Sequence, residues 1–216
     1  MKEGVHGLIA IAHELFPRGM AQDESGYDQT PEVRRQADLR ARARASYAAF
    51  RTILHRLEER FPGRVEERSA GILAPTQMGQ DRCFDGLLDL PLRQPGERRR
   101  SLEFLVSFVA PYYVIHSVYG VPEGTDYPAR VCSLELSADE VPYAATIAEE
   151  VEAAFPGYEL LPAAVAGVVV PDVMVCPGTQ ARIVGCLFSD DWLRRVPNGQ
   201  GVWVWGSTEA PAVPAR

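Results

Sequence analysis

The sequence predicts an α+β fold in which an N-terminal helical pair is followed by an antiparallel-rich sheet with one covering helix. Three observations predict this class. Apolar residues follow helical spacing over 47–61, acidic and apolar residues alternate over 81–90, and a strongly apolar run, LEFLVSFVAPYYVIHSVY, spans 102–119. Strands and helices do not alternate regularly along the chain, so a doubly wound parallel sheet is not expected.

The run 102–119 has to be classified as a membrane span or as buried strands. Glu103 is its one charged residue, and Pro111 interrupts its centre. A spanning helix needs about 20 apolar residues, whereas Val, Ile, Phe and Tyr favour strands. We therefore predict two buried strands, 102–109 and 112–119, joined at the proline.

Two helices are expected before the sheet. A short amphipathic helix spans 4–16 and ends at Pro17. A long helix begins after Thr30, a good N-cap residue followed by proline at the first helical position, and ends at Pro62-Gly63. The first half of this helix alternates arginine with alanine and has only a thin apolar stripe.

The rest of the chain predicts more strands and one further helix. Ser137-Ala138-Asp139-Glu140 fits a capping box, although Pro142 is an alternative start, and Pro156-Gly157 ends the helix. Besides the two strands of the apolar run, extended segments are expected within 64–75 and over 81–90, 131–136, 158–161, 168–175 and 201–206.

Length and composition indicate one large domain, or one domain with a helical extension. We assign 1–62 to a helical segment packed on the main domain, 63–206 to the sheet domain and 207–216 to a disordered tail. The net charge of −7 disfavours nucleic acid and anionic membranes and suits a basic partner. The N-terminal stretch lacks the basic region and cleavage site of a signal peptide, so the expected compartment is the cytoplasm.

Sequence motifs of common enzymes and cofactor sites are missing from the chain. No GxGxxG, GxxxxGK[ST], GxSxG or HExxH pattern occurs. The four cysteines, Cys83, Cys132, Cys176 and Cys186, form no CxxC pair, which argues against a structural zinc site. We expect buried thiols, with a Cys176–Cys186 disulfide as the alternative, and neither a cofactor nor a metal ion.

Acidic and aromatic residues are the candidate partner-binding residues. Three aspartates on one side of the 81–90 strand lie about 13 Å apart, too far apart for one metal ion but suited to a basic surface. The 189–192 stretch adds two acids and a tryptophan, and 201–206 adds two tryptophans on one face. A solvated face and a tryptophan core are the structural alternatives. The set is Asp81, Asp85, Asp89, Asp190, Asp191, Trp192, Trp203 and Trp205.

These features predict a non-enzymatic acidic protein-binding domain. Acidic complementarity speeds association with a basic partner, and aromatic anchors slow its release. An immunity-type inhibitor of a basic toxin fits this description. The apolar run 102–119 is also typical of a homodimer interface.

Two other functions stay open. A hydrolase or transferase would use His116, the one histidine in an apolar context, with Cys132, Cys83 or Asp172; the alternative is a hydrogen-bonded core histidine. A nucleic-acid accessory factor would use the eight arginines of 31–62, which stand against four acids. The strongly acidic remainder of the chain opposes nucleic-acid binding, and salt bridges to that remainder are the alternative.

Overall fold

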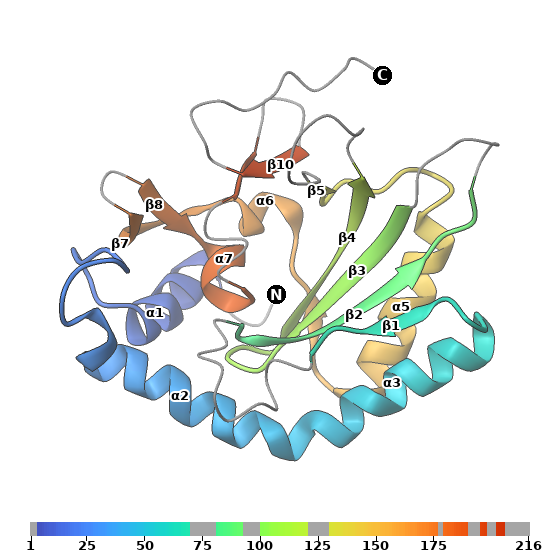
Figure 1. The fold of residues 1–216 in the computed structure, drawn as a ribbon, viewed down its shortest axis with the longest axis horizontal. Coiled ribbons are helices and arrows are strands. Elements are labelled where there is room, and N and C mark those ends of the chain that lie inside the picture. Colours follow the sequence, from blue (N-terminus) through green and yellow to red (C-terminus); the bar gives the residue numbers. More distant parts are fainter. Residues whose placement is uncertain are drawn as a thin grey trace.

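A computed structural model places an antiparallel sheet at the centre of the molecule, with helices on both faces (Figure 1). The α+β class is therefore confirmed. The structure describes residues 4–69, 81–92, 100–120, 130–176, 179–189, 195–197 and 202–205. The predicted tail 207–216 lies outside these ranges, and the division of the chain at residue 62 stays a prediction.

Among the described residues, eight strands form the main sheet, and two more form a separate hairpin. The main sheet has the order β1-β2-β3-β4-β5-β10-β9. The short strand β6 lies outside this order and pairs in parallel with β4. The strands are β1 Val65–Glu67, β2 Cys83–Asp89, β3 Arg100–Ser107, β4 Tyr112–Gly120, β5 Arg130–Ser133, β6 Glu159–Leu160, β7 Val169–Cys176, β8 Thr179–Arg182, β9 Arg195–Pro197 and β10 Val202–Trp205.

The helices begin largely where the local sequence predicts. Thr30 caps the predicted long helix by accepting a hydrogen bond from the Val33 N–H at 3.4 Å. This helix is split by a 3₁₀ turn at Arg44–Ser46, and its two parts form one arc below the sheet (Figure 1). The helices are α1 Val5–Leu15, α2 Pro31–Ala43, α3 Tyr47–Arg60, α5 Val141–Ala154, α6 Ala163–Ala166 and α7 Ile183–Leu187.

Helix α5 starts later than the capping box alone suggests. Its first residue is Val141, followed by Pro142, and Glu140 occupies the N-cap position. The Glu140 carboxylate still accepts a hydrogen bond from the Ser137 N–H at 2.8 Å, which is one half of the predicted box. Pro142 suits the first turn because a helix needs no N–H donor there.

The apolar run 102–119 forms the antiparallel pair β3–β4, as predicted. Glu103 faces His116, and Val106 faces Tyr113. Every residue of β3 is buried. Among the described residues, no helix is long and apolar enough to cross a membrane.

Two apolar cores lie on opposite faces of the sheet. Helices α3 and α5 cover one face, where the rings of Phe50 and Phe84 stack with centroids 5.1 Å apart. Helices α1, α6 and α7 and the β7–β8 hairpin cover the other face (Figure 1). Strand β2 serves both cores, because Phe84 and Leu88 point to one face and Cys83 points to the other.

The side chain of Arg82, the residue before β2, packs into the core between the sheet and helices α1 and α7. It is almost completely buried, and its guanidinium lies over the Phe16 ring at 4.9 Å. Its Nε and Nη2 donate to the carbonyl oxygens of Cys186 and Gly185, both at 2.9 Å, and Nη1 donates to Gln36 Oε1 at 3.2 Å. Arg82 therefore satisfies the carbonyl groups that α7 leaves open at its C-terminus.

Gly86 allows close packing between β2 and β3. It pairs with Phe104, and a Cβ atom at residue 86 would lie 2.2 Å from Phe104 Cζ. We expect Gly86→Ala to lower the free energy of unfolding by about 1–3 kcal/mol through overpacking. Urea unfolding measures this, with Gly4→Ala as the matched control because a Cβ there meets nothing within 4 Å. Equal midpoints for the two variants would contradict the packing argument.

Candidate functional site

Five ionisable side chains gather on one face of the main sheet. Four come from neighbouring strands β2 to β5, and the fifth follows β1 directly. We call this set the polar cluster: Arg68, Asp85, Glu103, His116 and Cys132.

Strand register brings these distant residues together. Glu103 faces His116 across β3 and β4, so the two side chains lie on the same face. Val118, two residues beyond His116 and hence on that face, pairs with Cys132 of β5. On β3, Leu105 lies two residues from Glu103 and therefore on the same face. Leu105 pairs with Asp85, so Asp85 lies on this face as well.

Glu103 contacts two other members of the polar cluster. Its Oε2 lies 2.7 Å from His116 Nε2, and its Oε1 accepts a hydrogen bond from Arg68 Nη1. The His116 and Cys132 side chains are fully buried, and Glu103 is nearly so. The cluster therefore satisfies charged groups inside the protein rather than at its surface.

His116 is held in its protonated form. Burial by itself would lower its pKa, but the interactions with Cys132 and Glu103 outweigh that effect and raise the pKa from 6.5 to about 9. At neutral pH an imidazolium therefore lies between a carboxylate and a sulfur atom.

For Asp85, burial has a larger effect on the pKa than the nearby positive charges do. Burial and the nearby Glu103 charge raise its pKa well above the usual range, while Arg68 and His116 act against this rise. Its backbone N–H donates to Ser69 Oγ at 2.7 Å. Its Oδ1 is buried and has no hydrogen-bond partner among the described residues. Asp85 thus places a buried carboxyl oxygen within the polar cluster.

The polar cluster can perform two kinds of chemistry. A carboxylate, an imidazole and a thiol in contact can share and move protons. They can also hold a metal ion, since Glu103, His116 and Cys132 each offer one ligand atom and these atoms all lie within 4.8 Å of one another.

A second feature, the apolar groove, lies at the edge of β4. Strand β5 pairs with residues 117–120 of β4 and β6 pairs with 112–113, so the edge between them opens into a space of about 300 Å³. Residues from α5 and from the segments flanking it complete the walls. Among the lining residues are Ile115, Leu134, Leu136, Val141, Ala145 and Leu160.

The segment that forms most of the apolar groove is uniformly acidic. Residues 131–181 contain no Lys or Arg but eight acids, so their charge of −8 exceeds the net −7 of the whole chain. The eight are Glu135, Asp139, Glu140, Glu149, Glu150, Glu152, Glu159 and Asp172.

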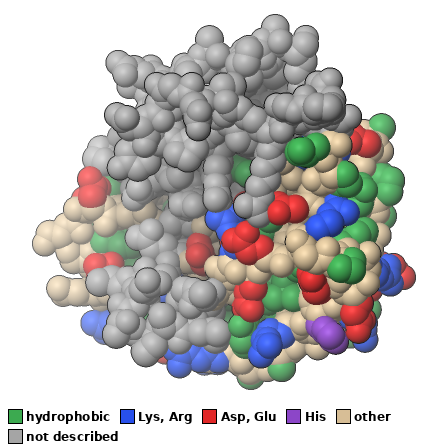
Figure 2. Space-filling model, turned by 45° about the vertical axis from the view of Figure 1, so that its right-hand side comes forward, with side chains coloured by type: hydrophobic (Ala, Val, Ile, Leu, Met, Phe, Trp, Pro, Cys, Tyr) green, Lys and Arg blue, Asp and Glu red, His purple; other side chains and the backbone are tan. Residues whose placement is uncertain are grey.

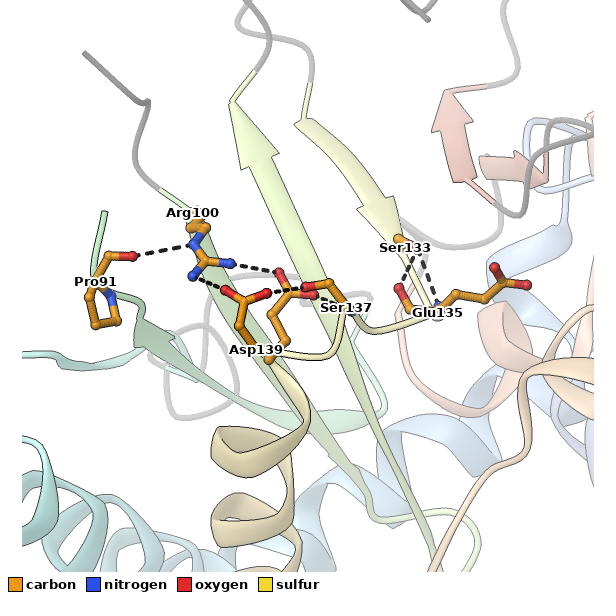
Figure 3. Close-up of polar contacts among 7 residues, drawn as sticks. Pro91, Arg100, Ser133, Glu135, Ser137 and Asp139 are labelled. Atoms are coloured by element: carbon orange, nitrogen blue, oxygen red, sulfur yellow. Dashed lines mark hydrogen bonds and ion pairs between the residues drawn. The ribbon is translucent and has the colours of Figure 1, made fainter. Parts of the chain in front are cut away.

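Arginines from other elements balance part of this charge. Arg100, which is buried, binds Asp139 at 2.6 Å and Glu140 at 3.4 Å (Figure 3). The Glu135 carboxylate extends away from these contacts (Figure 3). Among the described residues, Arg100 therefore neutralises Asp139 and Glu140, whereas no ion pair involves the Glu135 carboxylate.

The α3–α5 face carries further ion pairs. Arg60 bonds Glu149 at 3.0 Å and Glu150 at 2.8 Å, and Arg56 bonds Glu150 at 3.3 Å. Acidic and basic side chains accordingly lie next to one another on this part of the surface (Figure 2). Two arginines of the predicted long helix, Arg56 and Arg60, thus form ion pairs with acidic residues of α5.

The three aspartates of the predicted acidic row are all partly buried. Asp89 Oδ1 accepts a hydrogen bond from Ser101 Oγ at 2.8 Å. Asp85 belongs to the polar cluster, where it interacts electrostatically with Glu103 and His116. A partner-binding role for the three carboxylates stays a prediction.

The other predicted contact residues are only partly described. Asp190, Asp191 and Trp192 lie outside the described residues. Trp203 and Trp205 belong to β10, where the backbone of Trp203 pairs with Cys132. Their binding role stays a prediction, since the structure describes the backbone of β10 and not its side chains.

The residues predicted for catalysis separate into two groups. His116 and Cys132 meet in the polar cluster, and Cys83 lies buried in β2 with a pKa raised well above its usual value, chiefly by burial. Asp172 is exposed in the separate β7–β8 sheet. Cys83, Cys132 and Cys186 are buried. The alternative of a Cys176–Cys186 disulfide stays a prediction, because the side chain of Cys176 lies outside the part of the chain that the structure describes.

Glu103 was not among the residues predicted from the sequence to form a site. Its signal was present, because it is the single charge in the apolar run 102–119. A lone carboxylate in a buried strand needs a partner. The sequence does not show that this partner is His116, since that depends on the strand register.

Comparisons of the chain with protein-family models, with curated proteins and with solved structures found no match. A function therefore has to be inferred from the polar cluster, the apolar groove and the charge distribution.

The raised pKa of His116 predicts a pH-dependent stability. A histidine whose native pKa exceeds its unfolded value stabilises the fold fully below about pH 6.5, and this contribution is lost as the pH rises through about 9. We expect the free energy of unfolding to fall over this interval, and His116→Gln to remove that fall. Urea unfolding of both proteins at each pH measures the difference. An identical fall in the variant would contradict the assignment.

Proposed function

We propose that this chain is a non-enzymatic protein-binding domain that engages a basic partner through the apolar groove. The observation that carries the proposal is the position of this groove, which is built mainly from the one long segment that has eight acids and no basic residue. Apolar contact would provide the affinity, and the acidic surroundings would select the partner's charge.

Exposed apolar side chains concentrate at the groove. Four large apolar side chains among the described residues are exposed, and two of them, Val141 at 52% and Leu160 at 49%, line it. Single exposed apolar residues are common, but a pair across one hollow is typical of a contact site. The volume of about 300 Å³ is at the lower limit for small-molecule pockets, about 300–1,000 Å³, and suits anchoring side chains of a protein.

Charge explains why the partner should be basic. Glu135 lies between two groove residues, Leu134 and Leu136, and Glu159 precedes Leu160. Carboxylates beside an apolar contact attract a partner that carries Lys or Arg around its apolar anchor, and they repel an acidic one. Association should therefore be faster at low salt.

An immunity-type inhibitor of a basic toxin is a specific protein of this class, and we propose it as the finer assignment. Such an inhibitor needs fast association and slow release. The acidic 131–181 segment supports the first property, and the exposed apolar pair Val141 and Leu160 supports the second.

The two alternative functions have weaker support. Complete burial of His116 and Cys132 leaves those atoms no surface for an organic substrate, which weighs against a hydrolase or transferase. Arg35, Arg56 and Arg60 are engaged in ion pairs with acids of the chain itself, which weighs against an arginine surface for nucleic acid.

The first experiment identifies the partner. The tagged chain is used to capture proteins from its native extract at low and at high salt, and mass spectrometry identifies them. We expect one stoichiometric basic protein whose recovery falls as the salt concentration rises, because salt screens the charges around the groove. Recovery of the chain alone at both salt concentrations would overturn the proposal.

Groove variants then test the contact site with that purified protein. We expect Leu160→Lys to weaken binding at least tenfold, because it places a charge where an apolar anchor is buried. Leu92→Lys is the matched control, since Leu92 is an equally exposed leucine, at 55%, that does not line the groove. Surface plasmon resonance gives both constants. An equal loss in the two variants would refute the groove as the site.

The charge of the rim is tested separately. We expect Glu135→Lys to slow association at low salt and to have little effect at high salt, because a rim charge acts mainly on diffusional encounter. Association rates at two salt concentrations measure this. A change confined to the dissociation rate would contradict an electrostatic role for Glu135.

A further inference from the structure

We infer that the polar cluster is a binding site for one zinc ion, with Glu103, His116 and Cys132 as its protein ligands. The sequence predicts no zinc site because the cysteines are not paired. The structure instead assembles an oxygen, a nitrogen and a sulfur ligand from three adjacent strands, β3, β4 and β5, all within 4.8 Å of one another. Ligands from separate strands leave no spacing motif in the sequence.

The geometry is close to what zinc requires. Zinc binds imidazole nitrogen and carboxylate oxygen at about 2.0–2.2 Å and thiolate sulfur at about 2.3 Å, so tetrahedral ligand atoms lie roughly 3.3–3.6 Å apart. His116 Nε2 and Glu103 Oε2 are now 2.7 Å apart and share a proton. Zinc would replace this proton and the thiol proton of Cys132, releasing two protons with no change of oxidation state.

Asp85 provides a second, independent observation. Its Oδ1 is buried without a hydrogen-bond partner among the described residues, and the residue interacts electrostatically with Glu103 and His116. A buried acceptor of this kind is costly unless something satisfies it. A zinc-bound water in the fourth position would do so.

The size and chemistry of the cluster favour zinc over other ligands. His116 and Cys132 are fully buried, and neither the apolar groove nor the cleft of about 500 Å³ between α1 and α2 includes a cluster residue. A single ion fits such an interior site. Calcium and magnesium prefer oxygen ligands, whereas a thiolate with an imidazole selects zinc-like metals.

Cobalt(II) titration tests the site, because cobalt adopts the same geometry and is coloured. The metal-free full-length chain is titrated with Co²⁺ and then with Zn²⁺. We expect one equivalent of Co²⁺ to produce a thiolate-to-cobalt charge-transfer band with tetrahedral d–d bands, and one equivalent of Zn²⁺ to remove both. Absence of these bands in the wild-type chain would overturn the inference.

Variants show whether the bands come from this cluster. Cys132→Ser should remove the charge-transfer band, and Asp85→Asn should weaken binding about 10–100-fold through the outer shell. Cys186→Ser and His55→Ala are the matched controls, since Cys186 is another buried thiol and His55 is an exposed imidazole. Both should bind as the wild type does.

A folded-state check keeps the test decisive. Glu103→Gln preserves the side-chain shape and should weaken Co²⁺ binding while the far-ultraviolet circular dichroism stays unchanged. Retention of the charge-transfer band in a folded Cys132→Ser protein, or its loss in Cys186→Ser, would assign the metal to another place and refute the proposed ligands.

Discussion

Burial of β3 on both of its faces is the constraint from which the site follows. A strand covered on both sides has no solvent to receive a charged side chain, so Glu103 must find its partners inside the protein. It finds them in His116 on the neighbouring strand and in Arg68 beyond β1. The polar cluster is thus the local consequence of placing one carboxylate in a double-sided core.

Strand β4 contributes to both proposed sites of the molecule. Ile115 and His116 are neighbours in the chain, and their side chains point to opposite faces of the sheet. His116 belongs to the polar cluster, whereas Ile115 lines the apolar groove together with Val114, which lies on the His116 face. The two sites share no residue, so a substitution can be placed in one without changing a residue of the other.

Local signals predicted most elements of the fold. The Thr30–Pro31 start, the alternation in β2 and the β3–β4 pair were all recognisable from residue type and spacing. The short helices α6 and α7 were not, because four or five residues carry too little periodicity. They are defined by tertiary packing instead.

The site was harder to predict because it depends on register. Strands 102–109 and 112–119 joined by a two-residue turn would pair His116 with Leu105. The observed turn is longer, since β3 ends at Ser107 and β4 begins at Tyr112, and this places Glu103 opposite His116. A shift of two residues keeps each side chain on its face but changes its neighbour. The sequence alone leaves open whether His116 lies next to Cys132, Cys83 or Asp172.

The contacts of Arg82 have a consequence for synthesis on the ribosome. The carbonyl groups that receive its guanidinium lie 103 and 104 residues further along the chain. Strands β2 to β4 can pair as soon as they emerge, because their partners are close in sequence. Arg82 must wait for Gly185 and Cys186, so the nascent sheet keeps one face incomplete until the last part of the chain is translated. During that interval the uncovered apolar face of the sheet is the kind of surface to which chaperones bind.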